Sequence, residues 1–207
     1  MQKFAEKYPP DCTVRTSRKV YADEFAGYTS ASHQLATYSG CTFGAGIYRL
    51  YSVDEVRTWT TAVQECFPKY TDRVRCFGRD WLCNQFCLDS ERRETGEALI
   101  LLFEIGTGQV LKIPETFESF HSALIVNDPE AALAELFFGR WRSVDPRPLA
   151  DDECVGYKVP LFLGGKDEVG NLARSDASVY WHLAAQMLVR ASALRHGTEI
   201  KGVSVKD

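Results

Sequence analysis

Short apolar runs alternate with glycine and polar turns through the middle of the chain, a pattern typical of β-strands. Runs rich in β-branched and aromatic residues predict strands at residues 47–51, 74–77, 84–88, 98–103 and 109–113. The tripeptide Gly106-Thr107-Gly108 separates the last two runs and predicts the turn of a hairpin. The pattern therefore indicates a meander of antiparallel strands.

Apolar residues at helical spacing predict helices before and after this meander. Up to about residue 38 the helical signal is weak. The expected starts of stronger helices are Asp54, Pro114, Asp128-Pro129 and Ser175. Pro68 should end the first of these helices, and residues 195–197 should end the last. The helices that start near residues 114 and 129 should lie on the sheet.

In the last helix the apolar positions at helical spacing are Val179, Leu183, Met187, Leu188 and Ala191. We expect this stripe to face the interior, because a helix on a globular protein buries its apolar face.

Residues 154–176 combine a strand, a glycine hinge and a helix cap in one short unit. The apolar run at residues 159–163 predicts a short buried or edge strand, with Pro160 near its start, where a missing N–H is tolerated. Gly164 and Gly165 should end that strand. The turn that follows should present Lys166, Asp167 and Glu168.

A meander flanked by helices predicts an α+β fold, with a mixed, largely antiparallel sheet and helices packed against it. Residues 143–152, which include Pro146 and Pro148, are the best candidate for a linker or a long surface loop. We therefore expect one segment at residues 1–142, containing the sheet and the two helices that follow it, and a second at 143–207. The two should pack as one compact unit.

The charge of the chain limits its partners. Its formal net charge is −4 and its pI is near 5.6. A generic nucleic-acid-binding protein usually needs a basic surface, so we expect no direct contact with nucleic acid and a mild preference for a basic partner. The N-terminus has no apolar signal region, and the run at residues 98–103 is too short to span a bilayer. We expect a cytoplasmic protein without a membrane partner.

The cysteines predict neither a disulfide framework nor a metal site. Their count is seven, an odd number, in a chain without a secretion signal, so we expect reduced thiols. Cys76, Cys83 and Cys87 form the closest cluster, but it has no C-x-x-C pair and no nearby histidine. We expect neither a metal nor another cofactor.

No catalytic motif is present in the sequence. It lacks G-x-S-x-G, H-E-x-x-H and a glycine loop that ends in G-K-[ST]. For His121 and His182 we favour a structural place on a helix, and we predict no catalytic residue. An enzyme with a dispersed site, built from His121, Asp80 and Cys83, is the less favoured alternative.

Three segments carry a family resemblance. The sequence GYKVPLFLGGKDEVGNL followed by SDASVYW resembles the Tdi-type C-terminal domain of type VI secretion DNase immunity proteins. FGAGIYRLYSVDEV, at residues 43–56, is similar to the GAD-like domain usually found at their N-terminus, and FGRDWLCNQFCLD, at residues 77–89, resembles its continuation. Family members tend to have a small or polar residue where this chain has Cys83.

The resemblance implies a GAD-like domain at residues 1–142 and an immunity-type domain at residues 143–207. It also implies a relationship to SUKH-type immunity proteins, whose mixed sheet has helices on one side. The implied function is to bind and neutralise a cognate effector toxin, a DNase, by occluding or locking its active site. A SUKH-type adaptor that serves a cellular partner has the same composition and stays an alternative.

Acidic residues near the C-terminal unit are the main toxin-binding candidates. Residues 145–176 hold seven acidic against four basic residues. Two acidic groups flank the same predicted strand, and an acidic surface can steer a protein onto the positive groove of a nuclease. The candidates in this region are Asp151, Asp152, Glu153, Lys166, Asp167 and Glu168.

Arg79 and Asp80 are further toxin-binding candidates, since Arg, Asp and Trp at a strand end are compatible with an interface hot spot. The same residues are compatible with a local salt bridge under Trp81. For Trp81 we favour a place in the core, and the same holds for Tyr180 and Trp181.

Overall fold

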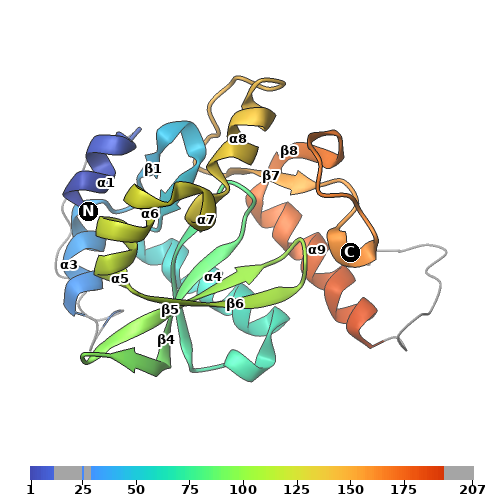
Figure 1. Cartoon of the computed structure of the whole chain (residues 1–207). Helices are drawn as coiled ribbons and strands as arrows, with labels where there is room; N and C mark the ends of the chain where they lie inside the picture. Colours follow the sequence, from blue (N-terminus) through green and yellow to red (C-terminus); the bar gives the residue numbers. More distant parts are fainter. Residues whose placement is uncertain (12–24, 26–28, 194–207) are drawn as a thin grey trace.

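The computed structural model describes residues 1–11, 25 and 29–193, and its centre is a six-stranded sheet (Figure 1). Its strands follow one another in the sheet in chain order, and every pairing is antiparallel. They are β1 (Thr42–Phe43), β2 (Tyr48–Leu50), β3 (Val74–Asp80), β4 (Gln85–Glu94), β5 (Glu97–Glu104) and β6 (Gln109–Thr116). Strands β2 to β6 form the predicted meander, β1 was not predicted, and the α+β class is confirmed. Glu104 pairs with Gln109 across the predicted glycine turn.

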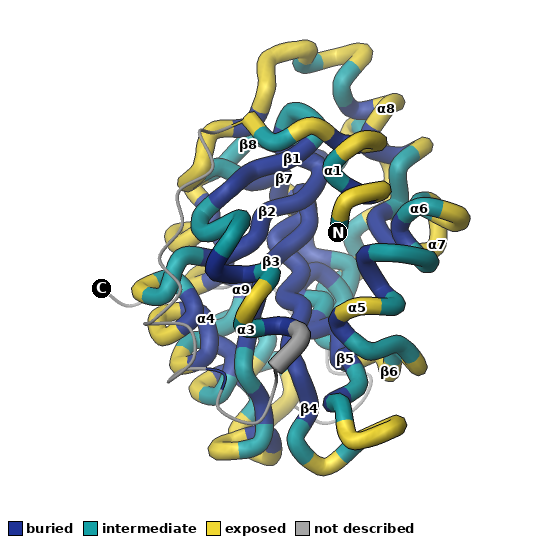
Figure 2. The backbone as a smooth tube through the Cα atoms, turned by 90° about the vertical axis from the view of Figure 1, so that its left-hand side faces the viewer, coloured by how far each residue is buried: buried dark blue, intermediate teal, exposed yellow. Residues whose placement is uncertain are grey.

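Helices cover both faces of the sheet, whereas the resemblance implied one. Gln85 and Phe86 are neighbours on β4 and therefore point to opposite faces. Phe86 packs against Phe120, with ring centroids 5.0 Å apart. Gln85 accepts a hydrogen bond from Tyr51, whose ring stacks on Trp59 of α4 (Val53–Cys66). Figure 2 shows the buried strands at the centre and the exposed outer faces of helices on either side.

One helical segment spans residues 117–127 on the Phe120 face. It consists of α5 (Phe117–Ser119), a π-helical turn (Phe120–Leu124) and α6 (Ile125–Asn127). The helices α1 (Gln2–Lys7) and α3 (Thr29–Thr37) contact it and agree with the helical signal expected up to residue 38. On the opposite face, α9 (Ala177–Ser192) lies beside α4.

The predicted helix starts are displaced by a few residues. Ser52, not Asp54, is the N-cap of α4, because the Ser52 hydroxyl accepts from the Glu55 N–H while the Glu55 carboxylate accepts from the Ser52 N–H. Pro114 lies within β6, an edge strand that tolerates a missing N–H, and the next helix is capped by Thr116. Asp176, not Ser175, caps α9.

Two predictions at helix ends near Pro68 and Pro129 are confirmed. The helix α4 ends at Cys66, just before Pro68. Asp128 caps α7 (Pro129–Leu133), but the predicted helix is broken at Ala134, whose φ of 49° is left-handed, and α8 (Glu135–Arg142) continues beyond it. From α8, Trp141 stacks on Trp81 with ring centroids 6.1 Å apart.

The C-terminal unit forms a separate sheet of two strands, β7 (Glu153–Tyr157) and β8 (Leu172–Asp176). The strand predicted at residues 159–163 is wrong: Leu161–Leu163 form a 3₁₀ turn. The N–H groups of Leu161 and Phe162 donate to the Gly106 carbonyl, so this run meets a turn of the large sheet instead of a strand partner. Gly164 has a φ of 85° and ends the run as expected, and residues 166–168 are exposed.

The buried side of α9 also differs from the expected stripe. Its buried residues are Ala177, Tyr180, Trp181 and Ala184, which confirms the core place favoured for Tyr180 and Trp181. Val179 and Leu183 are exposed, because α9 turns its aromatic and alanine residues toward its neighbours. The helix ends at Ser192, and the end predicted at residues 195–197 lies outside the described residues.

Residues 143–152 form the long loop predicted there, and it is fixed at several points. Leu149 is buried, and its N–H donates to the Ala45 carbonyl. A Cβ atom at Gly46 would lie 2.4 Å from that of Leu149, so the loop passes directly over a position that has no side chain. One hydrophobic cluster includes buried residues from Phe4 to Ala184.

The cysteines correct one expectation. Cys41 is disulfide-bonded, whereas we predicted a reduced thiol. The free cysteines Cys66, Cys76, Cys83, Cys87 and Cys154 are all buried. Cys12 lies outside the described residues, as does Val20 of the weak N-terminal pattern. Within residues 1–11, 25 and 29–193, no helix has the length and apolar character needed to cross a membrane.

Candidate functional site

A groove between α4 and α9 is the site with the richest chemistry. Two cavities of about 340 and 310 Å³ adjoin there and share Ala62, Trp181 and His182. We call their union the α4–α9 groove. We call the part lined by Arg49, Glu55, Trp59, Arg79, Asp151, Asp152 and Asp176 its polar half. We call the other part, which holds Ala62, Ala185 and Val189, its apolar half, and this part is also lined by Glu65, Gln186 and Arg190.

Two tryptophans meet in the groove. Trp59 is on the buried side of α4 and stacks on Tyr51, with ring centroids 5.9 Å apart and planes inclined by 8°. Trp181 of α9 meets Trp59 edge to face at 5.9 Å. The Trp181 Nε1–H is buried and has no hydrogen-bond acceptor within the described residues. An unpaired buried donor is costly, so this indole is a place where an acceptor from outside would be favourable.

Two arginines extend into the groove from the large sheet. Arg49 of β2 and Arg79 of β3 are directly opposite in the antiparallel pair, and both are buried. Arg49 pairs with Glu55 at 2.8 Å and with Asp151 at 2.9 Å. Arg79 donates from Nη2 to the carbonyl oxygens of Asp151 (2.6 Å) and Glu153 (3.1 Å). Both guanidinium groups are therefore committed to groups of the protein itself.

Carboxylates line the rim of the groove. The Asp151 side chain is 70% exposed even though it pairs with Arg49. Asp176 accepts the Val179 N–H at the start of α9 and is exposed. Asp152 is fixed through its carbonyl, which accepts the Ala177 N–H, but its exposed carboxylate makes no hydrogen bond or ion pair with any described residue. Asp152 is thus the free anion of the rim.

Glu153 belongs to a different arrangement from its two acidic neighbours. Its carboxylate accepts from the Ala150 N–H and pairs with Arg174. The hydrogen bond from Ala150 and the charge of Arg174 lower the pKa of Glu153. The predicted run of three acidic residues therefore separates into two rim carboxylates and one that holds the loop to β8.

Asp80 and Asp167 lie together in another place, an acidic cavity of about 280 Å³ that Glu104 and Glu130 also line. No basic side chain is among the described residues that line it. Asp80 is buried and accepts from the N–H groups of Leu82 and Asn84, and its burial raises its pKa to about 7. Among the salt bridges of the described residues none joins Asp80 to Arg79, and Trp81 is in the core as favoured.

The remaining candidates from the C-terminal turn are spread over an exposed loop. Lys166 and Glu168 are exposed, and Asp167 accepts a hydrogen bond from Tyr157 at 2.7 Å. The structure thus brings Arg79, Asp151 and Asp152 together and leaves the turn residues apart from them.

Of the groups proposed for a dispersed active site, Asp80 and Cys83 share one turn, whereas the side chain of His121 makes its hydrogen bonds to other residues. His121 is fully buried: its Nδ1–H donates to the Phe117 carbonyl at 2.7 Å, and its Nε2 accepts from the Tyr48 hydroxyl at 2.9 Å. Burial lowers the pKa of His121 to about 3, so the ring is neutral. No hydrogen bond or ion pair joins its side chain to those of Asp80 and Cys83 in the described structure.

His182 is on the exposed face of α9 and contacts Gln186. Across the described ranges, no group of three His, Cys, Asp or Glu side chains could hold a metal ion.

The sequence analysis did not predict that Arg49, Glu55, Trp59 and Trp181 line the groove. Arg49 carried a usable signal, since it is a charged residue inside the apolar run at residues 47–51 and a buried charge requires partners. Trp59 and Trp181 carried none, because helical spacing cannot distinguish a residue in the core from one at the base of a groove.

Residues 145–188 match the family model of the C-terminal region of the type VI secretion system immunity protein Tdi1. No curated protein gives a significant match to this chain. Among solved structures, the crystal structure of Atu4351 from Agrobacterium tumefaciens is similar, with a TM-score of 0.63 and 12% identity over 89% of this chain and 88% of that one. This likeness shows a shared fold. Over residues 145–188 the chain is therefore similar to the C-terminal region of a type VI secretion immunity protein, and this region supplies Asp151, Asp152 and Trp181 to the groove.

Proposed function

We propose that this protein is a cytoplasmic immunity protein that binds and neutralises a cognate type VI secretion effector, and that this effector is a DNase. The observation that carries the proposal is the family match at residues 145–188. Its start at residue 145 also supports the predicted boundary between segments 1–142, taken as GAD-like, and 143–207. Neutralisation needs binding alone, so no catalytic residue of this chain takes part.

The charge of the groove supports a nuclease partner. A DNase must hold a polyanion, and so its substrate surface is basic. The exposed carboxylates of Asp151 and Asp152 are complementary to such a surface. Complementary charge speeds association, to about 10⁸ M⁻¹s⁻¹ or more at low salt, and a toxin must be captured before it reaches the chromosome. The same charge disfavours direct binding of nucleic acid by this chain.

The test is survival of cells that express the cognate effector, with and without the protein. Purified effector should cleave plasmid DNA, and an equimolar amount of the protein should abolish the cleavage and elute with the effector as one complex. Rescue with a stable complex supports neutralisation by binding. Absence of both rescue and complex refutes the proposal and favours an adaptor for a cellular partner.

A further inference from the structure

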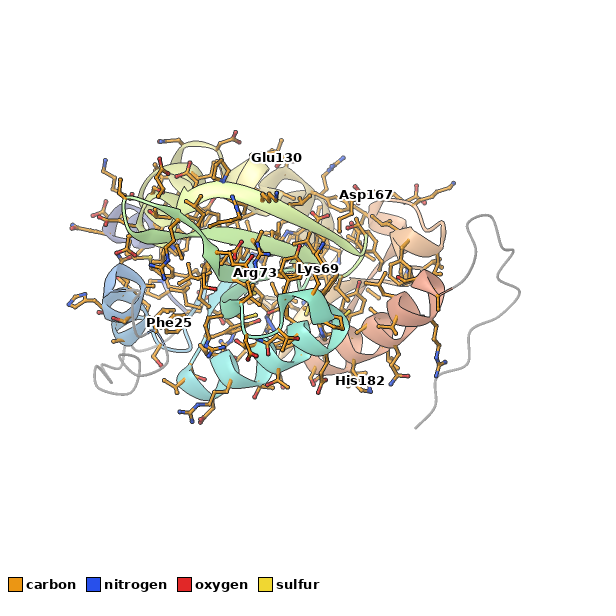
Figure 3. All side chains as sticks on the ribbon, turned by 90° about the horizontal axis from the view of Figure 1, so that it is seen from below. Phe25, Lys69, Arg73, Glu130, Asp167 and His182 are labelled. Carbon is orange, nitrogen blue, oxygen red and sulfur yellow. The ribbon has the colours of Figure 1, made fainter. Side chains whose placement is uncertain are left out.

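We propose that the α4–α9 groove is the surface that receives the effector, and that its occupant is an effector segment in which an Arg or Lys stands next to an apolar residue. This assignment rests on the proposed function and adds the surface and the chemistry of the contact. Figure 3 shows α4 and α9 side by side at the lower edge of the molecule, with His182 on α9.

The charges of the polar half select a cation. Four carboxylates and two guanidinium groups line this half. Both guanidinium groups already donate to carboxylates or carbonyls of the protein, and they are buried beneath the rim. The exposed charge is therefore that of Asp151, Asp152 and Asp176. An incoming guanidinium or ammonium group would find Asp152 unpaired and accessible, whereas an anion would meet the carboxylates first.

The buried indole N–H of Trp181 points to a peptide as the occupant. Trp181 lines both halves of the groove. Its Nε1–H lacks an acceptor among the described residues. This N–H has almost no exposed surface, so the Trp181 ring or its neighbours must shift before a main-chain carbonyl of an incoming segment can supply that acceptor, which a free ammonium compound does not have. This second observation is independent of the acidic rim.

The apolar half gives the segment a direction. Val189 is 52% exposed and lies with Ala62 and Ala185 beside Trp181. An apolar side chain next to the cation would cover these residues while the cation stays at the rim. Glu65, Gln186 and Arg190 also line this half, so the place for the apolar side chain is the patch of Ala62, Ala185 and Val189.

The acidic cavity at Asp80 is the weaker candidate for this contact. The carboxylates of Asp80, Glu104, Glu130 and Asp167 each accept a hydrogen bond from the protein itself. None of the buried donors without an acceptor in the described structure belongs to a residue that lines it.

The experiment compares matched variants of the full chain for association with the purified effector. Asp152→Lys changes the rim, and Val189→Asp changes the apolar half. Glu94→Lys and Val144→Asp make the same changes at exposed positions away from the groove. We expect Asp152→Lys to slow association about 10-fold or more at low salt and to weaken its salt dependence. Val189→Asp should mainly speed dissociation, and both controls should stay within about 2-fold of the wild type.

A peptide probe tests the groove without the effector. Tryptophan fluorescence follows titration with acetyl-Leu-Arg-Leu-amide and with the neutral citrulline analogue. The arginine peptide should bind at least about 10-fold more tightly, a preference that Asp152→Lys should remove. Equal binding of the two peptides overturns recognition of a cation by the groove.

Failure of the surface assignment differs from failure of the proposed function. If the wild type forms no complex with the effector, the immunity function fails. If the complex forms but both groove variants bind as the wild type does, the effector lies elsewhere and the assignment is overturned. A concentration-dependent dimer that Val189→Asp dissociates would assign the groove to a second copy of this chain and would also overturn it.

Discussion

Replacing Arg79 with methionine should destabilise the protein, because Arg79 holds the segment with the rim residues Asp151 and Asp152 against β3. The buried guanidinium donates to the carbonyl oxygens of Asp151 and Glu153 at 2.6 and 3.1 Å. A hydrogen bond from a charged group stabilises by about 1.5–3 kcal/mol, so the two together contribute about 3–6 kcal/mol. Methionine removes a buried cation, which returns part of that loss. We expect a net loss of about 2–4 kcal/mol in the free energy of unfolding.

Urea unfolding at 25 °C, followed by tryptophan fluorescence, measures this loss. For a chain of this length 1 kcal/mol corresponds to about 2–4 °C in Tm, so a 3 kcal/mol loss should lower Tm by about 6–12 °C. Arg79→Lys is the matched control, because it keeps the charge and can restore one of the two contacts, and it should lose less. A free energy of unfolding for Arg79→Met within about 0.5 kcal/mol of the wild-type value, with an unchanged m-value, would refute the reasoning.

Four further substitutions test the local geometry. Because burial raises the Asp80 pKa to about 7, the folded state holds a proton that the unfolded chain releases above about pH 4, so the contribution of Asp80 to stability should fall by about 4 kcal/mol in total as pH rises from about 4 to 7, while the lowered pKa of His121 acts in the opposite sense. Asp80→Asn should remove this fall when free energies of unfolding at pH 5 and pH 8 are compared; an equal fall in the variant would contradict it. Gly156→Ala would place a Cβ 2.3 Å from the Tyr180 ring and should cost about 1–3 kcal/mol in urea unfolding. In the same assay Gly139→Ala, whose Cβ would meet no described atom within 4 Å beyond its chain neighbours and helix backbone, should stabilise α8 by about 0.5–1 kcal/mol. Ser52→Ala removes the N-cap acceptor of α4 and should lower the free energy of unfolding in urea by about 1 kcal/mol. An unchanged free energy of unfolding would show that the cap does not stabilise α4.

The strands of the large sheet could be predicted because their signals are local. Apolar runs and the turn at Gly106–Gly108 lie within a few residues of one another, and tertiary packing did not override them. The ends of strands were less visible: β4 and β6 continue to Glu94 and Thr116 through polar residues that the apolar pattern omits. The helix caps were harder to predict, because the N-cap is the residue whose side-chain oxygen reaches a free N–H. Ser52 and Asp54 both carry such an oxygen, and the sequence does not show which of them reaches it.

The candidate site was predictable only in part, because its contacts join residues distant in the chain. Asp151 and Asp152 were expected as exposed anions, and the structure places them on the rim. Glu153 has the same charge and adjoins them, yet Arg174 holds it elsewhere. Asp80 was considered beside Arg79, but consecutive strand residues point to opposite faces, and the two side chains line different cavities.

The tryptophans of the chain fall into two pairs with different surroundings. Trp81 and Trp141 are stacked in the core away from the groove, whereas Trp59 and Trp181, which are also buried, meet edge to face at the base of the groove. Replacing the core pair with phenylalanine would leave the groove pair as the only indole emitters among the four tryptophans. The protein would then report occupancy of its own groove by a change of emission, so that competitors can be screened without attaching a dye.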